Sequence, residues 1–152
     1  MTVSLTKSLP LAAAIVLSST SLASAAEIFT TKGVAINGYD PVAYFTEHKP
    51  VKGEARYTAT HRGAKFRFSS PEHRDLFAAN PDRFAPQYGG YCAYGTAKGY
   101  KATTEPQAFT VIDDKPYLNY NDSVAKTWKQ DIDGYVAKAD ANWDTVRTQP
   151  AP

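Results

Sequence analysis

The first 25 residues place the strongest constraint on what this chain can fold into. Leu9 to Leu17 form an almost unbroken apolar run, which is far shorter than the roughly 20 residues that a helix needs to cross a bilayer. Ala23-Ser24-Ala25 follows with the small-x-small pattern that is typical of signal peptidase sites. The sequence therefore predicts a signal peptide over residues 1–25, cleaved after Ala25. It also predicts a periplasmic or secreted location, with no stable membrane anchor after cleavage.

Removal of this segment leaves 127 of the 152 residues, which is enough for one domain with a modest core and too few for two. We therefore expect a single domain over residues 26–152. Of the 17 Lys and Arg residues only Lys7 is lost, so 16 basic residues remain against 15 acidic ones. This near-balance gives no electrostatic basis for binding nucleic acid. Ten Tyr and seven Phe residues can supply much of the core.

Two stretches predict β-hairpins. Apolar and polar residues alternate in residues 57–60 and 65–68, around a turn at residues 61–64. In this first hairpin the residues expected to face the core are Tyr57, Ala59, Phe66 and Phe68. Residues 109–112 and 116–120, joined by Asp113-Asp114, predict the second hairpin.

Helix-start chemistry appears at three places. Asp40-Pro41 predicts a short helix through residues 42–45, and Ser70-Pro71 predicts one ending near Ala79. Asn121 or Asp122 is expected to cap a C-terminal helical region, because apolar residues recur there at helical spacing. Residues 86–99 lack periodicity and are expected to form an ordered loop. Leu76, Phe77 and Phe84 are expected under the first hairpin, and Tyr117, Tyr120 and Trp128 in the core.

Hairpins followed by helices predict an α+β fold, with small antiparallel hairpins packed against short helices and a C-terminal helical region.

Three spaced motifs resemble the YHS domain, a small α+β module that occurs in metal-handling proteins and as stand-alone exported proteins. The matching residues are Asp40-Pro41-Val42, then His61-x-Gly63-x-x-Phe66-x-Phe68-Ser69-Ser70, then Phe77-x-x-Asn80-Pro81-x-x-Phe84. Residues 88–143, which include Gly89-Gly90-Tyr91-Cys92-Ala93, resemble the exported branch of that family. In some members of that branch the position of Cys92 is selenocysteine.

The departures from the family pattern concern its metal ligands. Metal-handling YHS modules have cysteines at the three positions that are Ala43, Ser69 and His73 in this chain. A soft-metal thiolate site of the kind that the resemblance implies therefore cannot be carried over intact. Only His73 keeps a side chain that can coordinate a metal.

Cys92 is the single cysteine, so it cannot form an internal disulfide. Such a thiol in an exported protein is buried and inert, bonded to another molecule, or kept for its reactivity. One hypothesis joins Cys92 to His61 and His73 as a copper or zinc site. A second makes Cys92 a redox thiol with an external partner, and a third is a non-catalytic interaction module that binds another exported protein. The sequence leaves open whether the protein is an enzyme.

Overall fold

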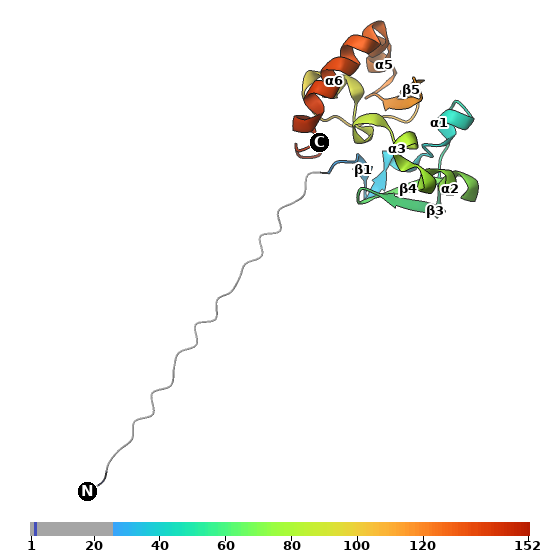
Figure 1. Cartoon of the computed structure of the whole chain (residues 1–152), viewed down its shortest axis with the longest axis vertical. Coiled ribbons are helices and arrows are strands. Elements are labelled where there is room, and N and C mark those ends of the chain that lie inside the picture. The colour runs from blue at the N-terminus through green and yellow to red at the C-terminus, as the bar shows by residue number, and fades with distance from the viewer. Residues whose placement is uncertain (1, 3–25) are drawn as a thin grey trace.

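The computed structural model describes Thr2 and residues 26–152 (Figure 1). Except for Thr2, the predicted signal peptide over residues 1–25 lies outside the described residues. The fold is α+β, as predicted. No helix among the described residues has the length and the apolar character needed to span a membrane.

The larger sheet has four strands in the order β1-β2-β4-β3. Their bounds are Thr30–Thr31 (β1), Val34–Ala35 (β2), Glu54–His61 (β3) and Ala64–Phe68 (β4). β3 and β4 form the first predicted hairpin, while β2 pairs with β4 in parallel. The second predicted hairpin is a separate two-stranded sheet of β5 (Phe109–Ile112) and β6 (Lys115–Leu118).

Helices connect and cover these sheets (Figure 1). The α-helices are α1 (Ala43–Thr46), α2 (Pro71–Ala79), α3 (Pro81–Phe84), α4 (Ala93–Lys98), α5 (Asp122–Trp128) and α6 (Ile132–Val146). The 3₁₀ turns are η1 (Ile36–Gly38), η2 (Gln87–Gly90) and η3 (Lys129–Asp131). α2 begins and ends as predicted, with the Ser70 side chain accepting a hydrogen bond from the His73 backbone.

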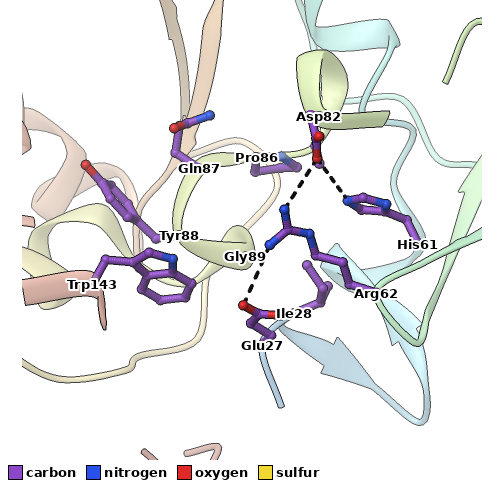
Figure 2. Close-up of a pocket in the computed structure, with 11 residues that line it drawn as sticks. Glu27, Ile28, His61, Arg62, Asp82, Pro86, Gln87, Tyr88, Gly89 and Trp143 are labelled. Atoms are coloured by element: carbon purple, nitrogen blue, oxygen red, sulfur yellow. Dashed lines mark ion pairs between the residues drawn. The ribbon is translucent and has the colours of Figure 1, made fainter. Parts of the chain in front are cut away.

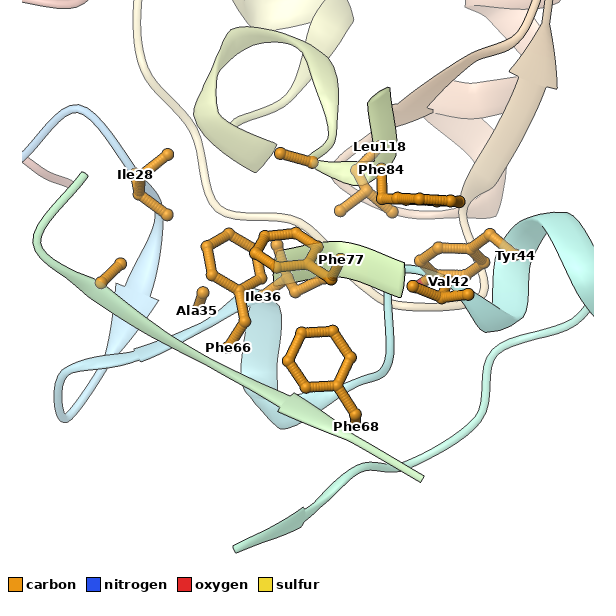
Figure 3. Close-up of a cluster of buried hydrophobic side chains, with 12 residues drawn as sticks. Ile28, Ala35, Ile36, Val42, Tyr44, Phe66, Phe68, Phe77, Phe84 and Leu118 are labelled. Atoms are coloured by element: carbon orange, nitrogen blue, oxygen red, sulfur yellow. The ribbon is translucent and has the colours of Figure 1, made fainter. Parts of the chain in front are cut away.

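The apolar side chains form two clusters. In the first, Phe66, Phe68 and Phe77 are stacked between the sheet and α2 (Figure 3), and Tyr57 and Ala59 pack against them. The second gathers Tyr88, Tyr117 and Trp128 with side chains of α6. The predicted inward face of the first hairpin is therefore confirmed, as is the burial of Phe84.

Three local predictions are wrong. Leu76 and Tyr120 are about half exposed. On α2 it is Phe77 that is buried in the core, and Tyr120 lies two residues beyond the end of β6 at Leu118. Residues 86–99 contain η2 and the helix α4 instead of a loop. Within the C-terminal region the chain breaks at Asp131, which caps α6 by accepting a hydrogen bond from the Gly134 backbone N–H.

The segment of residues 26–29 lies between η2 and the end of α6. The Phe29 N–H donates to the Gly89 carbonyl at 2.8 Å. The Ala26 carbonyl accepts from the Tyr91 hydroxyl and from the Lys101 ammonium, which also donates to the Arg147 and Gln149 carbonyls. These bonds fix the N-terminal segment against the C-terminal end of α6, and so position one wall of the cleft described below.

Candidate functional site

A fully buried carboxylate, Asp40, organises the first part of the candidate site. Its Oδ1 accepts from the backbone N–H groups of Val42 and Ala43, at 2.9 and 3.3 Å. Its Oδ2 accepts from the Ser69 backbone at 2.8 Å and from the Ser69 hydroxyl at 2.7 Å. The same oxygen lies 2.6 Å from His73 Nδ1. Both carboxylate oxygens are therefore already engaged by protein donors.

His73 is oriented by this carboxylate. Its backbone lies in the first turn of α2, where the Ser70 cap fixes the helix start. Because Nδ1 faces Asp40, the free ring nitrogen is Nε2, which lies 3.4 Å from the hydroxyl of the exposed Thr46. The imidazole side chain is 16% exposed. A carboxylate on one ring nitrogen fixes the tautomer and the orientation of the imidazole ring.

The three positions that the YHS resemblance makes cysteines come together at this carboxylate. Ala43 offers its backbone N–H, while Ser69 and His73 offer their side chains. Residues 33 positions apart in the sequence are thus joined by one buried group. From the sequence Asp40 was expected to start a helix and was matched to the first YHS motif, but its contact with His73 was not predicted. The signal that could have indicated it is that Ala43, Ser69 and His73 all occupy positions that the resemblance assigns to metal ligands.

Cys92 lies elsewhere, at the start of α4. Its sulfur accepts from the Gly95 backbone at 3.4 Å, and its thiol donates to Asn119 Oδ1 at 3.5 Å. The residue is 1% exposed. Burial raises the pKa of the Cys92 thiol, and nearby backbone N–H groups of Gly95, Tyr120 and Tyr94 offset the increase only in part. The sulfur is therefore a neutral, enclosed helix cap, and its partner Asn119 was not identified from the sequence.

His61 occupies a third environment, at the end of β3. Its ring packs against Phe66 and Phe77, and its Nε2 lies 3.5 Å from the Asp82 carboxylate. Burial, followed by the neighbouring Arg62 charge, lowers the pKa of His61. The ring is therefore neutral at neutral pH. His48, the remaining histidine, is exposed in the loop after α1.

The structure thus places Cys92, His61 and His73 with three different sets of partners. Among residues 26–152, no three His, Cys, Asp or Glu side chains are grouped so that they could hold a metal ion. Comparisons with protein-family models, curated proteins and solved structures found no significant match. The YHS resemblance accordingly stays a prediction from the sequence.

A cleft with a volume of about 260 Å³ lies beside His61. It lies between the turn of the β3–β4 hairpin and the segment of η2 and α6 (Figure 2). Its charged groups are Glu27, Arg62 and Asp82, and its aromatic groups are Tyr88 and Trp143. Of these lining residues only His61 was proposed from the sequence as a site residue, because the others come from separate stretches of the chain.

Proposed function

We propose that this chain is an exported YHS-like protein that binds copper or zinc through His73. The observation that carries the proposal is the 2.6 Å contact of His73 Nδ1 with the buried Asp40 carboxylate. Metal-bound histidines typically make this contact with their second ring nitrogen. It leaves Nε2 as an oriented donor at the position where the resemblance expects a metal ligand.

The donor chemistry selects among metals. The thiolates that favour Cu(I) are replaced by Ala43 and Ser69, and both Asp40 oxygens are engaged by protein donors. A single imidazole nitrogen suits Cu(II) or Zn(II), and Cu(II) is the tighter binder for a given nitrogen donor set. The remaining coordination positions would be filled by water or by a second molecule. We therefore expect weak, reversible metal binding that is suited to transfer.

Cys92 is not part of this proposal. Its sulfur caps α4 and lies against Asn119, away from the Asp40 carboxylate that holds His73. The redox hypothesis needs a thiolate that an external partner can reach, and a sulfur that is 1% exposed with a raised pKa gives it no support.

Copper titration followed by NMR tests the proposal on the unmodified protein. Cu(II) is paramagnetic and broadens resonances close to it, so its addition at pH 7.5 should broaden the His73 ring resonances before those of His61 and His48. Equal broadening of His48, which is exposed and lies outside the site, would overturn the proposal. Binding should also weaken as the pH falls, because protons compete for the imidazole nitrogen.

Variants identify the donor independently. His73→Gln should abolish the specific Cu(II) binding measured by calorimetry, whereas the matched control His48→Gln should leave it unchanged. Thermal unfolding of both variants shows whether the fold is retained. If Cys92→Ser abolished Cu(II) binding and His73→Gln did not, the result would instead support the metal site at Cys92 that the sequence suggested. Absence of any uptake by the folded wild-type protein would favour the non-catalytic interaction module.

Export is the second part of the proposal. It is supported by the apolar run and the Ala23-Ser24-Ala25 pattern. A protein recovered from the periplasm or the medium should begin at Ala26 when its intact mass is measured. Recovery of the full-length mass from the cytoplasm would contradict it.

A further inference from the structure

In the cleft between the β3–β4 turn and the segment of η2 and α6, the Arg62 guanidinium contacts two carboxylates through ion pairs that are longer than hydrogen bonds. Arg62 is half exposed and lies between Asp82 and Glu27 (Figure 2), at 3.5 and 3.6 Å. Both distances exceed the roughly 3.2 Å limit of an ordinary N–H···O hydrogen bond. His61 Nε2 is also 3.5 Å from Asp82. The guanidinium is therefore held in the centre of the cleft by two ion pairs, and it makes no hydrogen bond of ordinary length to either carboxylate.

The opposite side of the cleft is apolar and rigid. Tyr88 and Trp143 meet edge to face, with their ring centroids 5.9 Å apart, and Figure 2 shows both across the cleft from Arg62. The Tyr88 hydroxyl donates to Asp140 at 2.8 Å, which holds its ring in place. Ile28, which lies beside Glu27, and Pro86, which lies beside Asp82, add apolar atoms to the lining (Figure 2). An apolar group of a ligand would find its contacts here.

The charge balance decides which ligand fits. Arg62, with Arg147 at 3.2 Å from Glu27, supplies two positive charges, while Glu27 and Asp82 supply two negative ones. An anion would be repelled by the carboxylates, and a cation by the guanidinium groups. A ligand that carries both signs can pair with both. The volume of about 260 Å³ lies just below the roughly 300–1,000 Å³ usual for drug-sized ligands, so the ligand should be small.

We propose that this cleft binds a free α-amino acid with an apolar side chain. The α-carboxylate would accept the two parallel hydrogen bonds of the Arg62 fork. The α-ammonium would donate to Asp82 or Glu27, and the side chain would pack on Tyr88 and Trp143. This site is separate from His73 and does not depend on the proposed metal binding.

Titration with L-phenylalanine, followed by amide chemical shifts of the whole protein, tests the assignment. Saturable shifts should appear for residues of the cleft. Phenylalanine amide, which lacks the carboxylate, and N-acetyl-phenylalanine, which lacks the ammonium, should each bind at least about tenfold more weakly, since each loses one charge-assisted contact. Alanine should also bind more weakly, because it lacks the apolar group.

Two arginine variants complete the test. Arg62→Gln removes the guanidinium group that would bind the ligand carboxylate. Because Arg62 lies in an exposed turn, the fold should be retained, and L-phenylalanine binding should weaken about tenfold or more. Arg56→Gln makes the same change on the same hairpin, at an exposed residue outside the cleft, and should leave binding unchanged, as should His73→Gln. The assignment is overturned if L-phenylalanine and L-leucine cause no cleft shifts at millimolar concentration. It is equally overturned if the amide binds as well as the free amino acid, or if Arg62→Gln has no effect.

Discussion

Replacement of Gly89 by alanine should release the N-terminal segment from the domain. A Cβ atom at Gly89 would lie 1.8 Å from the Glu27 carbonyl oxygen and 2.9 Å from its carbon. Backbone atoms cannot interpenetrate in this way, so residues 26–29 must move. Gly89 also has a φ of +64°, where a side chain costs about 1 kcal/mol.

The size of the effect follows from what the segment buries. Ile28 and Phe29 are each 6% exposed, and full burial of such a side chain contributes about 1.5–3 kcal/mol. Release of the segment also breaks the Phe29 N–H bond to the Gly89 carbonyl, which is worth about 1 kcal/mol. If about half of the apolar contact is lost, Gly89→Ala should lower the free energy of unfolding by about 3 kcal/mol beyond the φ cost.

Gly63→Ala is the matched control. Gly63 has a φ of +78°, and a Cβ atom there would meet nothing within 4 Å, so this variant should lose only the roughly 1 kcal/mol of the φ cost. Urea unfolding gives the free energies of both variants. A difference of less than about 0.5 kcal/mol between them would refute the reasoning, since measured effects of unrelated surface changes are of that size. Because Glu27 and Ile28 line the cleft, Gly89→Ala should also weaken amino-acid binding.

Two further predictions concern Cys92 and His61. Cys92→Ala should lower the free energy of unfolding by about 1 kcal/mol, because α4 loses its cap, whereas Cys92→Ser keeps a capping atom and should cost less. Native protein should resist alkylation by iodoacetamide until it is unfolded, and rapid native labelling would contradict the enclosed sulfur. The pKa of His61 is lowered on folding, so below the ordinary value of about 6.5 the unfolded chain binds more protons and stability falls as the pH falls. His61→Gln should reduce this decline in urea unfolding, and an NMR titration of the His61 ring with a midpoint at or above 6.5 would contradict it.

Features that depend on contacts between residues close together in the chain were predicted correctly from the sequence. Alternation of Phe66 and Phe68 with polar residues set the face of β4 that is buried. Ser70 and Asn121 cap α2 and α5 as expected, because a cap bonds only to backbone two or three residues ahead. The helix α4 was not predicted, because part of what stabilises it comes from a residue far away in the chain. It lacks an apolar period, and its Thr96 and Ala97 carbonyls are bonded by Asn142 of α6.

Composition, periodicity and capping residues thus predicted the α+β fold of hairpins and helices, which the structure confirms, and identified the residues whose side chains are able to coordinate a metal. The tertiary structure alone decided how those residues are used. In the folded protein His73 contacts the Asp40 carboxylate, Cys92 is enclosed against Asn119, and His61 lies beside the mixed-charge cleft. The physical reason is that each of these contacts joins residues 21 to 33 positions apart, and such pairings follow from the packing of whole elements, which no local spacing encodes.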